Sequence, residues 1–195
     1  MTNRPKHCLT IPYETQQGQL LIAGQTINSI IKKIGQTAFY AYDKQVMKDQ
    51  VDSFRRYFPD ISLHYAMKAN PMQEVVDYIS GLVDGLDIAS VGEMDIAIQS
   101  STPASEISFA GPGKTLIELK RAIQAGVTLN IESEYELERI VSIAKQDNLL
   151  PRVAIRVNPN FELKASGMKM AGGPKPFGID AERVPALLQK MKSLP

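Results

Sequence analysis

The sequence lacks the features that mark disulfide-rich, membrane-spanning and secreted proteins. It contains one cysteine, Cys8, so it cannot form an intramolecular disulfide framework, and this favours a reducing compartment such as the cytoplasm. No apolar run approaches the roughly 18 residues of a membrane span. Residues 1–10 are polar and lack the apolar stretch of a signal peptide. We therefore expect a cytoplasmic protein without a membrane-embedded part.

The sequence also lacks the features of several kinds of binding and catalytic site. The formal net charge of +1 gives no reason to expect nucleic acid or an anionic membrane as a partner. No cluster of His, Cys, Asp and Glu has metal-ligand spacing, and neither a Walker loop nor a nucleophile elbow is present. What remains is an ordinary globular composition, with 44% hydrophobic and 22% charged residues. A chain of 195 residues is long enough for one sizeable domain.

A regular alternation of short apolar runs and amphipathic segments begins at residue 63. It predicts strands at 63–67, 86–89, 107–110, 127–131 and 152–157, and helices at 74–79, 92–98, 116–125, 133–145 and 184–191. This rhythm is typical of a parallel sheet covered by helices. Both an open doubly wound sheet and a (β/α)8 barrel have it, although the first turn, 68–71, lacks a glycine-rich phosphate fingerprint. Five units are too few for a barrel, so either the chain is a piece of a longer one or the sheet is open.

The residues before this region are less regular. We expect a helix at 27–34 that ends at Gly35, and a strand at 38–42. Asp43 can cap a following helix, in which Met47, Val51, Phe54 and Phe58 recur at helical spacing. That stripe is predicted to be core.

Lys68 is the first candidate for chemistry. Strand alternation would place it on one face with His64 and the small Ala66, which leaves room for its amine to reach a ligand. Burial favours the neutral amine, a nucleophile that can form a Schiff base. On local sequence alone, a solvated lysine at a strand end is the commoner outcome. His64 would lie deeper, as a packed core histidine.

Polar residues end every predicted strand, where the active site of a barrel would lie. They are Lys68, Asp87 with Ser90, the glycine-rich segment 111–113, Glu132, and Arg156 with Asn158. Asp87 and Arg156 interrupt apolar strands, so both should have partners, and a purely structural ion pair is equally open for Asp87.

Three other features are ambiguous or local. Ser133 and Glu136 form the pattern of a capping box, Asp180 could cap the last helix, and Glu132 has no assigned role. The glycine-rich segment 167–178 is either a surface loop or a lid over the strand ends.

The motif Tyr-Ala-Met-Lys-Ala-Asn at 65–70 resembles the lysine motif of pyridoxal-phosphate-dependent decarboxylases of the alanine-racemase fold. This family includes the diaminopimelate, ornithine and arginine decarboxylases. Segments 86–93, 109–114, 130–133 and 155–159 are similar to the motifs on the next strands, with Val91 where glycine or alanine is commoner. Pro-Phe-Gly-Ile at 176–179 resembles the diaminopimelate-decarboxylase-like branch found with exosortase and exopolysaccharide gene clusters.

The resemblance implies a partial (β/α)8 TIM barrel of about five βα units over residues 37–195. Residues 1–36 would belong to a second β-domain. Lys68 would form an aldimine with pyridoxal 5'-phosphate and later return a proton. Asp87 and Arg156 would line the cofactor site, Glu93 would lie near it, and Ser90 and Asn158 would also bind the cofactor.

The implied reaction is decarboxylation of a small-molecule amino acid, with diaminopimelate as the default substrate. A stacking histidine, a phosphate loop, an acidic partner of the pyridine nitrogen and second-domain residues would follow residue 195, in a longer homodimeric enzyme. Two alternatives stay open: an amino-acid racemase of the same fold, and a non-catalytic homologue that binds the cofactor or a partner. The N-terminal extension favours the enzyme over a single-domain carrier.

Overall fold

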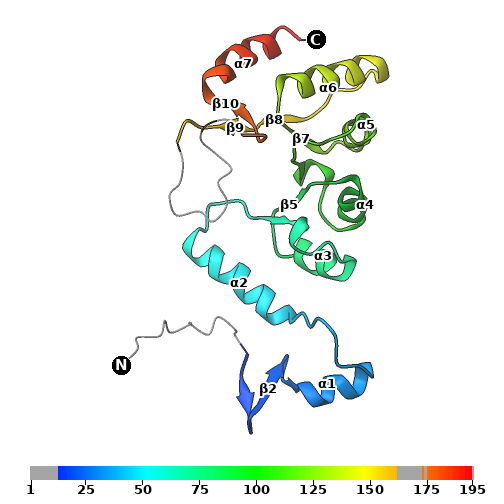
Figure 1. Cartoon of the computed structure of the whole chain (residues 1–195), viewed down its shortest axis with the longest axis vertical. Coiled ribbons are helices and arrows are strands. Elements are labelled where there is room, and N and C mark those ends of the chain that lie inside the picture. The colour runs from blue at the N-terminus through cyan, green and yellow to red at the C-terminus, as the bar shows by residue number, and fades with distance from the viewer. Residues whose placement is uncertain (1–12, 162–172, 174, 195) are drawn as a thin grey trace. The chain divides into compact units, whose positions relative to one another are not determined.

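The computed structural model describes residues 13–161, 173 and 175–194 (Figure 1). The chain divides into two compact units, Met1–Ile61 and Ser62–Pro195. Each is described by itself. These units are defined by contacts within this chain, so they do not test whether residues 1–36 belong to a β-domain of a longer protein. That assignment stays a prediction.

The first unit has a small antiparallel sheet and two helices. Its elements are β1 (Thr15–Gln16), β2 (Gln19–Ile22), β3 (Gln25–Thr26), α1 (Ile27–Ile34) and α2 (Lys44–Tyr57). Asp43 caps α2 by accepting a hydrogen bond from the Gln45 amide, and its other oxygen accepts one from Ala23. The strand predicted at 38–42 is wrong. That segment has no neighbouring strand among the described residues, and Tyr40 in its middle is 91% exposed.

The second unit is built on a five-stranded parallel sheet. Its strands are β4 (His64–Ala66), β5 (Gly85–Ile88), β6 (Ile107–Phe109), β7 (Thr128–Ile131) and β8 (Val153–Ile155), which neighbour one another in chain order. The helices between them are α3 (Gln73–Ser80), α4 (Val91–Gln99), α5 (Leu116–Ala125) and α6 (Glu134–Asp147). Figure 1 shows these four helices on the same side of the sheet. Sequential strands with helices on one face are the start of a barrel, because a doubly wound sheet reverses its strand order and carries helices on both faces.

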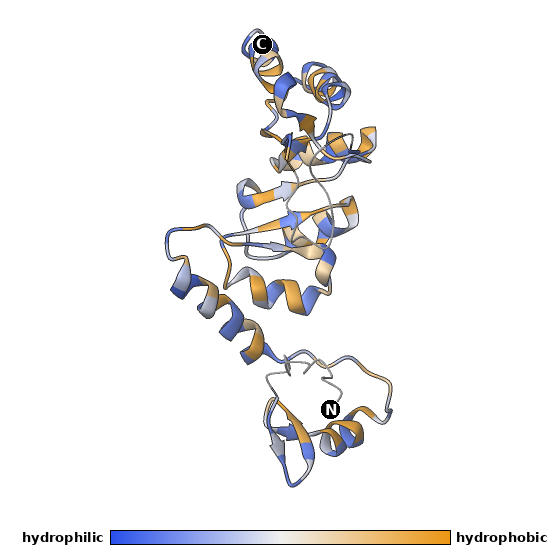
Figure 2. Ribbon diagram, turned by 60° about the vertical axis from the view of Figure 1, so that its left-hand side comes forward, coloured by the Kyte–Doolittle hydropathy of each residue, from blue (hydrophilic) through white to orange (hydrophobic). Residues whose placement is uncertain are grey.

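The core lies between this sheet and its helices. In the three central strands every second residue points to the helices and is fully buried, as Leu86 and Ile88 of β5 and Ile107 and Phe109 of β6 illustrate. The residues between them face the other side of the sheet, which is the inside of the incipient barrel. The strands accordingly mix apolar and polar residues in Figure 2.

The last part of the unit changes its pairing. After β8 the chain forms β9 (Val157–Asn158), which pairs in parallel with β10 (Ile179–Asp180), and α7 (Val184–Lys192) follows. A 3₁₀ helix, Ala181–Arg183, separates Asp180 from α7, so the prediction that Asp180 caps this helix is wrong. Ser133 caps α6 as predicted, but the Glu136 side chain does not complete a capping box.

Candidate active site

A row of polar side chains crosses the inner face of four adjacent strands. Asp87 of β5 lies at its centre and accepts a hydrogen bond of 2.6 Å from the Ser108 hydroxyl of β6. The Asn130 amide of β7 donates to Ser108 at 3.2 Å, and His64 Nδ1 of β4 lies 3.5 Å from Asp87 Oδ1. The prediction that Asp87 has polar partners is therefore confirmed. The expectation of a packed core histidine is wrong, since His64 faces this row and its side chain is 30% exposed.

The imidazole of His64 has room only because its neighbour on β5 is a glycine. His64 and Gly85 are register partners. A Cβ atom on Gly85 would lie 2.4 Å from His64 Cε1 and 2.4 Å from the Glu106 carbonyl oxygen. The missing side chain thus leaves space for the ring beside Gly85, where its Nδ1 lies 3.5 Å from Asp87 Oδ1.

Lys68 follows the first strand of the barrel but does not continue it. β4 ends at Ala66, and Lys68 is the middle residue of a 3₁₀ helix, Met67–Ala69, so strand alternation no longer applies to it. Its side chain is exposed, and none of the described residues forms a hydrogen bond or ion pair with it. The Tyr65 hydroxyl donates to the Asn70 carbonyl, and the Asn70 side chain accepts from the Met72 amide. The turn is therefore held in place by its neighbours, while the Lys68 amine has no partner among the described residues.

Glu132, directly after β7, joins three separate loops. Its Oε1 accepts from the Gly111 amide at 2.7 Å and from Arg156 Nη1 at 3.0 Å. Its Oε2 accepts from the Gly178 amide at 2.9 Å. The residue is 4% exposed, so these bonds are made away from water. This is the partner that an arginine at the end of an apolar strand requires, and the prediction that Arg156 has one is confirmed.

A second buried ion pair supports the first. Lys114 Nζ donates to Glu136 Oε1 at 2.9 Å and to the carbonyl oxygens of Gly111 and Asn130. Glu136 Oε2 accepts from the Glu132 backbone amide at 2.8 Å. Glu136 is engaged here, and this explains why it does not complete the predicted capping box.

Ser90 and Glu93 shape the start of α4. The Ser90 hydroxyl accepts from the Glu93 amide, and Glu93 Oε2 accepts from the Ala89 amide at 2.6 Å. Both side chains are thus used to cap the helix, and their predicted contact with a cofactor stays a prediction. Glu118 of α5 links the two helix starts, because it accepts from the Val91 amide as well as from Thr115. The Thr115 backbone hydrogen bond holds the pKa of Glu118 below its usual range.

Arg156 and Asn158 point to different surroundings. The Arg156 guanidinium lies 4.9 Å from the centre of the Phe177 ring, with 30% of its side chain exposed. Asn158 is buried in β9, where its amide donates to Asp180 and to the Gly173 carbonyl. Its role toward a cofactor stays a prediction. The lid proposed for 167–178 includes residues 167–172 and 174, which lie outside the described residues.

The sequence interpretation missed the Glu132 cluster. The sequence alone predicts no chemical role for Lys114, Glu136 or Glu132, although the place of Glu132 directly after β7 is a signal for one. Across residues 13–161, 173 and 175–194, no group of three or more His, Cys, Asp or Glu could hold a metal ion. No helix in that part of the chain is long and apolar enough to cross a membrane.

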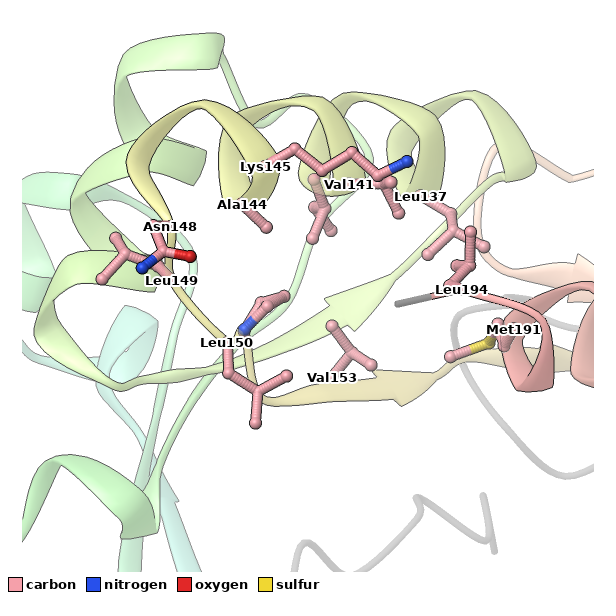
Figure 3. Close-up of a pocket in the computed structure, with 12 residues that line it drawn as sticks. Leu137, Val141, Ala144, Lys145, Asn148, Leu149, Leu150, Val153, Met191 and Leu194 are labelled. Atoms are coloured by element: carbon pink, nitrogen blue, oxygen red, sulfur yellow. The ribbon is translucent and has the colours of Figure 1, made fainter.

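A separate apolar cavity of about 460 Å³ lies on the helix side of the sheet (Figure 3). It is enclosed by α6, the start of β8 and the end of α7, and among its lining residues are Leu137, Val141, Val153 and Met191. No carboxylate lines it, and its lining includes residues 149–151, which precede β8. The active sites of barrels lie at the opposite strand ends, so we do not place the chemistry in this cavity.

Comparison with known proteins gives a consistent result. Residues 44–195 match the family model described as "Pyridoxal-dependent decarboxylase, pyridoxal binding domain". The diaminopimelate decarboxylase of Aquifex aeolicus is 35% identical over 172 residues, which cover 87% of this chain and 41% of that protein. An L-glutamyl-(BtrI acyl-carrier protein) decarboxylase of Niallia circulans is 34% identical over 86% of this chain and 40% of that protein.

Solved structures agree with the sequence matches. The structure of diaminopimelate decarboxylase from M. jannaschii superimposes with a TM-score of 0.81 at 28% identity, over 94% of this chain and 45% of that one. The Helicobacter pylori diaminopimelate decarboxylase complexed with L-lysine gives 0.76 at 28% identity, over 86% and 43%. The chain spans about two fifths of the length of the curated relatives it matches.

Proposed function

Because this chain belongs to the family of pyridoxal-dependent decarboxylases, through their pyridoxal binding domain, we propose that it supplies the first part of the active site of an amino-acid decarboxylase. The cofactor of the family is pyridoxal phosphate. The observation that carries the proposal is the free amine of Lys68, on a fixed turn directly after the first barrel strand.

The residues present fit the reactive end of this cofactor. A lysine amine that no protein group engages is accessible to the cofactor, and in its neutral form it bonds an aldehyde carbon. The polar row around Asp87 of β5 and the guanidinium of Arg156 after β8 provide charged groups on the same sheet. When bound, pyridoxal phosphate supplies the electron sink for cleavage of the bond to the substrate carboxylate. The chain's own part is to hold the cofactor through Lys68 and to return a proton from Lys68 Nζ to the substrate Cα.

The diaminopimelate decarboxylases among the relatives support diaminopimelate as the first substrate to test. The Niallia circulans relative acts, by its name, on an L-glutamyl group carried by a protein, so a carrier-linked amino acid is the second. We also propose that the protein works as a cytoplasmic homodimer. The single cysteine and the family resemblance support this. Membership of the exosortase-associated branch stays a prediction.

Reduction with borohydride tests the role of Lys68. Protein purified at its natural length from its source is treated with borohydride and mapped by mass spectrometry. We expect a pyridoxyl adduct on Lys68. Lys114 is an internal control, because it is buried and donates three hydrogen bonds, and it should stay unmodified. A folded protein with no adduct on Lys68 would refute the proposal.

Carbon dioxide release separates the reactions that the same lysine can support. Wild type and K68A are incubated with diaminopimelate and other amino acids. We expect release by the wild type and a loss of more than about 10³-fold in K68A, because the covalent route to the cofactor is gone. Inversion of the substrate Cα without carbon dioxide would identify a racemase, and an adduct with neither reaction would identify a cofactor carrier.

A further inference from the structure

We propose that Glu132 is a positioning residue that locks three loops of the barrel mouth together and thereby fixes Arg156. The inference rests on the proposed function, since it concerns the same site. The three groups that donate to Glu132 come from the loop after β6, from the end of β8 and from the residue before β10. One carboxylate therefore ties together backbone and side chain from segments that are 21, 24 and 46 residues away in sequence.

The arrangement requires a carboxylate. All three partners are donors, and they use both oxygens of Glu132. An ionised carboxylate is an acceptor on both oxygens, whereas an amide has one acceptor oxygen and one donor NH₂ group. Glutamine would place its NH₂ group against at least one N–H. With 4% exposure, water cannot fill the missing bonds.

The backbone is shaped to reach Glu132. Gly178 has φ +80° and Gly111 has φ +118°, in the region that residues with a side chain rarely adopt. A Cβ on Gly178 would lie 2.8 Å from the Arg156 carbonyl oxygen. Glycine therefore allows the chain to pass close to Arg156 while its amide points at the carboxylate.

The charge of Glu132 is balanced within the cluster. A buried carboxylate is costly unless it is paired and hydrogen-bonded. Glu132 pairs with Arg156, while Glu136 pairs with Lys114 and holds the Glu132 amide. The cluster thus holds two ion pairs, Lys114 with Glu136 and Arg156 with Glu132, joined by the hydrogen bond from the Glu132 backbone amide to Glu136.

Arg156 is the side chain that this cluster holds in position. Its guanidinium is bonded by Glu132 and stacked near the Phe177 ring, which leaves little freedom for the plane to turn. A group held in this way is already in position when a ligand binds. Without Glu132, Arg156 would lose its anionic partner and the Gly111 and Gly178 amides would lose their acceptor.

The substitution Glu132→Gln tests the inference in the full-length protein. Hydrogen exchange is measured without substrate. We expect exchange in the peptide spanning Gly111 or in the one spanning Gly178 to rise by about 10-fold or more, because the amide that faces the new NH₂ group loses its acceptor. We expect kcat for carbon dioxide release to fall by roughly 10- to 100-fold, because a displaced binding group costs that much.

Two controls separate positioning from general destabilisation. Glu134→Gln removes a nearby carboxylate of α6 that pairs only at the surface, with Arg183, and should change neither readout. Ile140→Ala lowers stability from the core of the same helix, and at a temperature where it stays folded it should keep the wild-type kcat. If Glu132 acts through Arg156, adding Arg156→Gln to Glu132→Gln should cost much less than it costs in the wild type.

The outcomes are distinct. Unchanged exchange at Gly111 and Gly178 in E132Q overturns the clamp, whatever the protein's activity. Faster exchange with unchanged kcat, or a loss of kcat no greater than in I140A, overturns the positioning role. Failure of the proposed function appears instead in the wild type, as absence of the Lys68 adduct, and the exchange data then decide the clamp alone.

Discussion

Gly85 shows how one absent side chain determines the position of another. The residue is the first of a buried strand, and glycine in a strand is usually unfavourable because it packs nothing and loses more conformational freedom. Its register partner is His64, and the space beside it is filled by the imidazole ring. Glycine therefore makes this strand less stable, but its missing side chain allows His64 to lie against Asp87.

Gly85→Ala should destabilise the protein by about 1–3 kcal/mol, because the new methyl group overlaps the Glu106 carbonyl and the His64 ring. Urea unfolding of wild type and variant measures the change. Gly113→Ala is the matched control, since no atom lies within 4 Å of the position that its new methyl group would take and its φ is not positive. G113A should be neutral or slightly stabilising. A G85A protein as stable as G113A would contradict the packing described here.

Among the helices, α4 and α6 begin with the same arrangement, a serine N-cap. Ser90 and Ser133 both have extended backbone, and each accepts a hydrogen bond from the amide of a glutamate three residues later. The glutamate side chains then differ. Glu93 returns to the Ala89 amide, whereas Glu136 joins the Lys114 cluster.

This likeness gives a test of the cofactor contact predicted for Ser90. Ser90→Ala and Ser133→Ala should each cost about 1 kcal/mol of stability, measured by urea unfolding, because each removes one helix cap. If Ser90 also binds the cofactor, S90A should lower the affinity for pyridoxal phosphate by a few-fold in a titration, whereas S133A should leave that affinity unchanged. Equal cofactor affinity in the two variants would limit Ser90 to its capping role.

The elements that sequence reasoning predicted well are those with local causes. The range of α5 is as predicted, since Thr115 and Gly126 mark its ends, and the five barrel strands follow from apolar runs between helices. The strand at 38–42 failed because a strand also needs a neighbour, which its own residues do not determine. The 3₁₀ helix that carries Lys68 was missed for a similar reason, since apolar residues continue through Met67. Glu132 could not be assigned because its three partners are distant in sequence.

At the scale of the whole chain, burial is distributed unevenly. The connected hydrophobic core lies entirely in the second unit. Among the described residues of the first unit, Val51 alone is a buried hydrophobic residue, and Phe58 from the same predicted stripe is 48% exposed. The expectation that this stripe is core is met only at Val51.

Hydrogen exchange of the 195-residue chain should reflect this difference. Amides of α1 and β2 should exchange at least about 100-fold faster than those of β5, β6 and β7, because local opening exposes little apolar surface in the first unit. The two sets are compared in one experiment, so each is the control for the other. Equal protection would mean that the first unit has a source of stability other than burial within this chain.

The short pair β9–β10 has a consequence for how such a protein can vary. The Ile179 amide donates to the Arg156 carbonyl, and Ile179 and Asp180 pair with Val157 and Asn158. The two ends of the chain between β9 and β10 are therefore joined. Doubling the length of a loop closed in this way costs only about 0.6 kcal/mol. The pair β9–β10, rather than the length of the chain between its two strands, therefore sets the position of the Arg156 backbone. Evolution, or an engineer who changes that length, has to keep the pair.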